Sequence, residues 1–128
     1  MYINIYNIKF QNSKVMKVIK TKHFPFNGYK AINLFGIIFT KGELSNKELN
    51  HEAIHTEQMK EMLYIFFYIW YGIEYLIIRL FHIKQHDAYK DVSFEEEAYI
   101  NDDNLNYISE RKHYTWTKYL GINSSKTA

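Results

Sequence analysis

The chain has 128 residues, the length of one domain with a single hydrophobic core. A net charge of +2 without a dense basic run argues against nucleic-acid binding, and the lack of cysteine excludes disulfides and thiolate metal sites. With 47% hydrophobic residues and only one proline, the composition is that of a folded protein. We predict one domain over residues 1–120 and a polar, disordered tail over 121–128. The start of the chain lacks the pattern of a signal peptide, so we expect a cytoplasmic location.

The first forty residues carry three segments that are typical of strands. Residues 2–10 and 14–20 are rich in β-branched and aromatic side chains, and residues 31–40 form the most apolar of the three segments. Residues 21–29 hold the only proline and an Asn-Gly pair, which indicates a loop with a turn. We expect one strand from each of the three segments and a small antiparallel sheet built from them.

A helix is predicted to begin at Ser45. Ser45 and Glu48 form the S-x-x-E capping box that marks a helix start. Neither glycine nor proline follows until Gly72, so we expect a long helix that could continue into residues 63–81.

The rest of the chain is also expected to be helical. After a polar loop over 82–92, Ser93 and Glu96 repeat the capping box and begin a helix that frays near 101–104. A last short helix is expected within 105–119. The predicted fold class is therefore α+β, mostly α, with the small N-terminal sheet packed on a helical core.

The predicted long helix carries the sequence His51-Glu52-Ala53-Ile54-His55. Two histidines four residues apart share one helix face and can bind one zinc ion through their ring nitrogens. Glu52, about 100° around the helix, can act as general base towards a water on that metal. The preceding strand supports this interpretation, because an extended peptide can pair with an edge strand beside the metal helix. The competing interpretation is a pair of surface histidines on an amphipathic helix.

A catalytic zinc ion needs a third protein ligand. Position 61, where a third histidine would extend the motif, is a glutamate. We rank Glu95 first, because it lies three residues before the small Ala98 on a shared helix face, which allows close approach to the histidine helix. Glu97 ranks second. A helix macrodipole alone would also favour carboxylates in this first turn. The full set of downstream candidates is Glu74, His82, His86, Glu95, Glu96, Glu97 and His113.

Glu74 is the main rival of Glu95. A carboxylate inside so apolar a stretch needs a partner, and a metal ion would serve. In an unbroken helix, however, Glu74 would lie about 28 Å along the axis from His55, too far to share an ion. Only a sharp turn near residues 62–64 would bring it closer. Its other interpretation is a buried pair with Arg79 or a tyrosine hydroxyl.

Peptide hydrolysis also needs a donor that stabilises the oxyanion. The sequence does not rank the candidates, and each has a structural or solvent-facing role as its alternative. They are His82, His86, Tyr89, Tyr99 and His113.

Residues 63–81 form an apolar stretch close to the length that spans a bilayer. Its two charged residues, Glu74 and Arg79, would be costly in lipid. Three interpretations compete: a core helix, which we favour, a helix on the membrane surface, and a membrane span.

The order of HExxH, a long apolar helical segment and E-x-x-A resembles a compact gluzincin metallopeptidase. It is similar to the HtpX-like and CAAX-processing peptidases, and more loosely to the peptidase domains of penicillin-sensor proteins. The resemblance implies a zincin-like fold with zinc (Zn2+) bound by His51, His55 and Glu95, and Glu52 as general base. Those families usually carry Asp after the Ala, where this chain has Tyr99.

A smaller likeness concerns Gln58, which lies three residues after the second histidine. It resembles the HExxHxxQ variant of small bacterial zincin-like domains.

The leading functional prediction is zinc-dependent hydrolysis of a peptide or protein substrate. The first alternative is a non-catalytic zincin-like module with a binding or regulatory role. The second is a membrane-associated structural protein in which the HExxH sequence is accidental.

Overall fold

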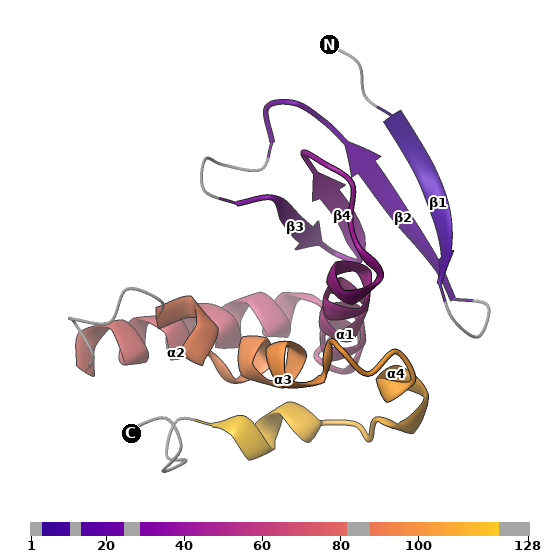
Figure 1. Ribbon diagram of the computed structural model, residues 1–128. Coiled ribbons are helices and arrows are strands. Elements are labelled where there is room, and N and C mark those ends of the chain that lie inside the picture. The colour runs from indigo at the N-terminus through magenta and orange to yellow at the C-terminus, as the bar shows by residue number, and fades with distance from the viewer. Residues whose placement is uncertain (1–3, 11–13, 25–28, 82–87, 121–128) are drawn as a thin grey trace.

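The computed structural model describes residues 4–10, 14–24, 29–81 and 88–120. Figure 1 shows a small sheet on one side of helix α1 (Asn46–Glu61) and the remaining helices on the other. These are α2 (Ile65–Phe81), α3 (Ser93–Asn101) and a C-terminal segment of short helices. The predicted fold class, α+β and mostly α, is confirmed. The predicted disordered tail over 121–128 lies outside the described residues.

The sheet has four strands in the order β1-β2-β4-β3. These strands are β1 (Asn4–Phe10), β2 (Lys14–Lys20), β3 (Ala31–Leu34) and β4 (Ile37–Thr40). The pairs β1–β2 and β3–β4 are antiparallel, but β2 and β4 are parallel. The prediction of a purely antiparallel sheet is therefore wrong at the central pair. The chain crosses from β2 to the far edge, forms β3 there, and returns beside β2 as β4.

Residues 31–40 form a hairpin and not the single predicted strand. Phe35 and Gly36 make a two-residue turn with φ of 55° and 88°, the positive values that suit a tight hairpin. The Gly36 amide donates to the side-chain oxygen of Asn33 at 2.9 Å. Gly36, inside an otherwise apolar run, is the sequence signal for this turn. Its consequence is that β3 becomes an edge strand.

The predicted start of α1 is confirmed and the predicted continuation is wrong. Ser45 caps the helix and Glu48 completes the capping box. After Glu61, Leu63 and Tyr64 adopt φ of 51° and 60°, and α2 leaves α1 at a bend of 109°. Left-handed backbone costs a residue other than glycine about 1–2 kcal/mol, so no propensity rule points to this turn.

Helix α1 packs between two hydrophobic clusters. The first lies against the sheet and consists of Met16, Val18, Ile38, Leu49 and Ala53. The second joins the end of α1 to α2, α3 and the C-terminal segment and consists of Met59, Phe67, Ile78, Val92, Phe94 and Trp116. Because both clusters use α1, the histidine helix is the central element of the fold.

Helix α3 begins at Ser93, but its predicted capping box is absent. The N-cap is Val92, and no side chain of the helix caps its own end. Glu74 of α2 does so instead: its carboxylate accepts from the Ser93 amide and hydroxyl, each at 2.7 Å, and from the Trp70 indole at 3.1 Å. The buried Glu74 carboxylate therefore fixes where α3 begins.

The predicted last helix over 105–119 is broken into two short pieces. They are α4 (Tyr107–Glu110) and a 3-10 helix (Thr115–Tyr119). A further 3-10 turn, Ala88–Asp91, lies within the predicted loop.

The apolar α2 does not reach the length and composition of a membrane span. Within the described residues no single helix does so, and only α1 and α2 taken together across their bend meet both criteria.

Candidate metal centre

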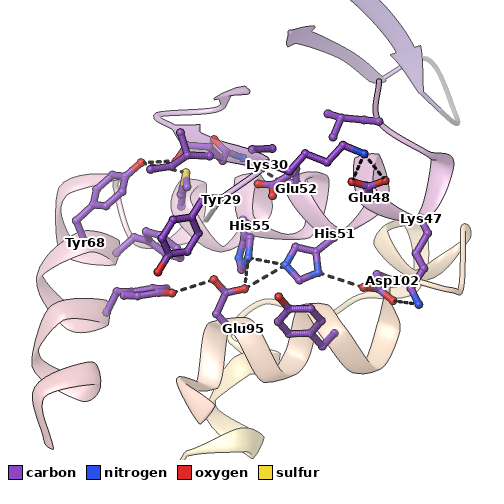
Figure 2. A pocket seen from close by; sticks show the side chains of 18 of the residues that line it. Tyr29, Lys30, Lys47, Glu48, His51, Glu52, His55, Tyr68, Glu95 and Asp102 are labelled. Atoms are coloured by element: carbon purple, nitrogen blue, oxygen red, sulfur yellow. Dashed lines mark hydrogen bonds and ion pairs between the residues drawn. The ribbon is translucent and has the colours of Figure 1, made fainter. Parts of the chain in front are cut away.

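The side chains of His51 and His55 of α1 point towards Glu95 of α3 (Figure 2). The two Nε2 atoms are 3.2 Å apart, and the Glu95 Oε1 lies 3.1 Å from the first and 2.9 Å from the second. A tetrahedral zinc ion holds its ligand atoms about 3.4 Å apart. The three residues predicted as ligands are thus brought together at nearly that spacing.

The far ring nitrogen of each histidine is already hydrogen-bonded. The Nδ1 of His51 lies 3.1 Å from a carboxylate oxygen of Asp102, and that of His55 lies 2.8 Å from the side-chain oxygen of Gln58. Both oxygens can only accept, so each Nδ1 carries the proton and each Nε2 lone pair faces Glu95. Two lone pairs and one carboxylate oxygen therefore converge, which is a donor set that fits a divalent cation.

His55 and Glu95 shift each other's pKa so that the charged form of each is favoured. Burial lowers the pKa of His55, but the carboxylates of Glu95 and Glu52 outweigh it and raise that pKa to about 9. Burial also opposes ionisation of Glu95, yet the imidazoles of His55 and His51 hold its pKa well below its usual range. The Glu95 carboxylate therefore favours positive charge beside the histidines, whether it is carried by a proton or by a metal cation.

His51, His55 and Glu95 line a cavity with a volume of about 750 Å³. Glu52 lines this cavity as well. Burial raises the pKa of Glu52, although the histidines act in the opposite direction. A carboxylate with a raised pKa beside a metal centre suits the role of general base.

Edge strand β3 forms a wall of this cavity, together with α1 and α2. The Asn33 amide donates to the Glu52 carbonyl at 3.0 Å and to the Thr56 hydroxyl at 2.9 Å, which ties β3 to α1. The Tyr68 hydroxyl accepts from the Phe35 amide at 2.9 Å, which ties the hairpin to α2. An edge strand held in this position can pair with an extended peptide in the cavity.

The rival ligands lie elsewhere. Glu97 is buried in a cluster with Arg111, Gln58 and the Tyr107 hydroxyl. The sharp turn that could bring Glu74 closer to the histidines is present. The Glu74 carboxylate, however, is directed at Ser93. Glu96 is not part of the group of three, and His113 lies 3.4 Å from Glu61 with 84% of its side chain exposed. His82 and His86 lie outside the described residues.

Two of the predicted oxyanion donors lie in the described part of α3 and the turn before it. The Tyr99 ring packs against His51 with centroids 4.5 Å apart and lines the cavity. Tyr89 lies in the 3-10 turn before α3, and His113 does not line the cavity.

The sequence does not point to Tyr71, which nevertheless orients Glu95, the predicted third ligand. Its hydroxyl donates to the second carboxylate oxygen of Glu95 at 2.9 Å, which leaves the first oxygen facing the histidines. Burial and the charge of Glu95 raise the pKa of Tyr71, so its hydroxyl stays a donor.

Asp102 is the second residue without a sequence-based expectation. It is 3% exposed, and the Asn50 amide fixes its backbone by donating to its carbonyl at 2.8 Å. Asp102 lies seven residues after Glu95, which is two helical turns and therefore the same face. That seven-residue spacing is the sequence signal that could have identified Asp102. The resemblance points to position 99 instead, where the related families carry an aspartate.

We expect Asp102→Asn to weaken zinc binding by about 10- to 100-fold, because it removes the charge that orients His51. Competition with a chromophoric zinc chelator measures the affinity. Asp103→Asn is the matched control, since that neighbouring side chain is 78% exposed. Equal affinities for the two variants would show that Asp102 does not position the ligand.

Comparison with protein-family models, curated proteins and solved structures finds no match to this chain. The resemblance to gluzincin peptidases therefore stays a prediction.

Proposed function

We propose that this protein is a zinc-dependent metallopeptidase. The supporting observation is the meeting of three oriented donor atoms, from His51, His55 and Glu95, within 3.2 Å of one another at the wall of a large cavity. Two histidines and one glutamate form the ligand set of a catalytic zinc ion with an open fourth position. Bound zinc would lower the pKa of its water and polarise the scissile carbonyl.

The protein's own groups account for the remaining steps. Glu52, with its pKa raised by burial, takes the proton of the attacking water and passes it to the leaving amine. Tyr71 and Asp102 hold the ligands in place. The Asn33 carbonyl already accepts from the Tyr68 hydroxyl, so the start of β3, at Ala31, is the part of this edge that would pair with an extended substrate in the cavity. Of the predicted oxyanion donors whose side chains the structure describes, Tyr99 and not His113 lines the cavity, and we assign Tyr99 that role.

Metal content tests this proposal directly. Protein purified without exposure to chelators should contain one zinc ion per chain by elemental analysis, and Glu95→Ala should contain none. Glu96→Ala is the control, because it removes the neighbouring carboxylate, which is not part of the group of three. Absence of stoichiometric metal from the wild type would overturn the proposal. Zinc retained by Glu95→Ala would remove Glu95 from the ligand set.

A further inference from the structure

Helix α2 has two faces of opposite character. Its inner face directs Tyr68, Tyr71 and Tyr75 to the cavity and buries Phe67 and Ile78 in the core. Its outer face is apolar and exposed, each side chain by at least 39%. We call this face the outer stripe; it consists of Ile65, Phe66, Ile69, Trp70, Ile73, Leu76, Ile77, Leu80 and Phe81.

The outer stripe is unusually large and wide for a solvent-facing surface. Its side chains expose on the order of 1,000 Å², against a few hundred for the largest apolar patch of most monomers. At 100° per residue it covers about 160° of the helix circumference. A single helix packed against it would cover only about 100°. A convex face of this width is better covered by a continuous apolar medium.

In the described part of the chain, α2 and residues 111–120 expose basic side chains and no acidic ones. Glu74 is the only acidic residue of α2 and is buried, whereas Arg79 is exposed. Trp116 contacts Trp70 of the stripe with ring centroids 5.8 Å apart. The segment around Trp116, residues 111–120, contains no acidic residue but has two exposed lysines, Lys112 and Lys118. This distribution complements anionic lipid headgroups and would make two copies of the face repel.

One end of the stripe is hollowed. A mostly apolar groove of about 340 Å³ lies there, and its one acidic residue, Glu61, is buried and paired with Arg111. The groove is lined by Glu61, Met62, Leu63, Phe66, Ile69, Trp70 and Tyr114. Tyrosine and tryptophan at the border of an apolar face are favoured where hydrocarbon meets water. The groove therefore has the chemistry of a lipid–water interface.

We infer that the outer stripe of α2 docks this protein on the surface of an anionic lipid bilayer. The helix lies in the interface with Ile, Leu and Phe side chains among the acyl chains and Arg79 at the headgroups. Because the inner face of the same helix lines the cavity, docking holds the cavity next to the membrane. This inference does not depend on the metal chemistry.

Co-sedimentation with vesicles tests the docking. The wild type should sediment with phosphatidylcholine vesicles that contain phosphatidylglycerol, and less with phosphatidylcholine alone. Ile73→Glu/Ile77→Glu should lower the partition coefficient at least tenfold, because both charges would enter the acyl region. Ile100→Glu is the matched control, since Ile100 is an equally exposed apolar residue on α3. Arg79→Gln should reduce only the dependence on phosphatidylglycerol.

Trp70 provides a second readout. Brominated lipids should quench the wild type and should not quench Trp70→Phe, because the remaining Trp116 is buried. The inference is overturned if the wild type does not bind vesicles, or if Ile100→Glu binds as weakly as the double variant. It is also overturned if light scattering shows a dimer that Ile73→Glu/Ile77→Glu dissociates and vesicles do not bind, since the stripe is then a protein interface.

Discussion

Glu52→Gln should retain one zinc ion per chain and lose peptide hydrolysis by roughly two to four orders of magnitude. The amide has the size of the carboxylate, so the cavity and the ligands His51 and His55 keep their places. The amide, however, cannot accept the proton of the attacking water.

Hydrolysis of unfolded casein and zinc content, measured on the same sample, separate catalysis from metal binding. Glu57→Gln is the control, because that side chain belongs to the same helix but not to the cavity lining. If Glu52→Gln hydrolyses casein as fast as Glu57→Gln, Glu52 is not the base. If the wild type binds zinc and hydrolyses no peptide, a non-catalytic zincin-like module becomes the better account.

The largest loss of stability is expected from Arg111→Met. The Arg111 guanidinium lies between the carboxylates of Glu61 and Glu97, and all three side chains are at most 4% exposed. Methionine keeps much of the volume but leaves two buried carboxylates without their cation. Breaking a buried ion pair in this way costs about 3–5 kcal/mol of unfolding free energy.

Urea unfolding followed by circular dichroism gives that free energy. Lys112→Met is the control, because Lys112 is exposed and should change stability by no more than about 0.5 kcal/mol. Since Glu97 also holds Gln58, which orients His55, Arg111→Met should in addition weaken zinc binding. Equal stability of the two variants would show that the other hydrogen bonds of Glu61 and Glu97 hold these carboxylates without the guanidinium.

Local rules predict the parts of the site that lie on one helix. Helical spacing places His51 and His55 on one face, and the capping box at Ser45 fixes where that helix begins. The small Ala98 favours Glu95 over its neighbours as the predicted ligand, and Glu95 is the carboxylate of α3 that lies next to the two histidines.

The remaining features of the fold and the site depend on tertiary packing, which local sequence rules do not predict. The turn at Leu63 and Tyr64 uses left-handed backbone without glycine, so the sequence predicts an unbroken helix. Glu74 could reach the predicted metal site only if the chain turned sharply after α1. The chain does turn there, but the Glu74 carboxylate accepts from the amide and hydroxyl of Ser93. A buried carboxylate needs donors, and the uncapped start of α3 supplies them.

The turn at residues 63–64 also fixes the helical phase of α2. Deleting one residue there would rotate every α2 side chain by about 100° relative to α1. Gly72 would then take the place of Tyr71 beside Glu95, and Tyr75 would take the place of Glu74 beneath α3. The number of residues between His55 and Tyr71 is thus as strict a requirement of this protein as His51 and His55 themselves.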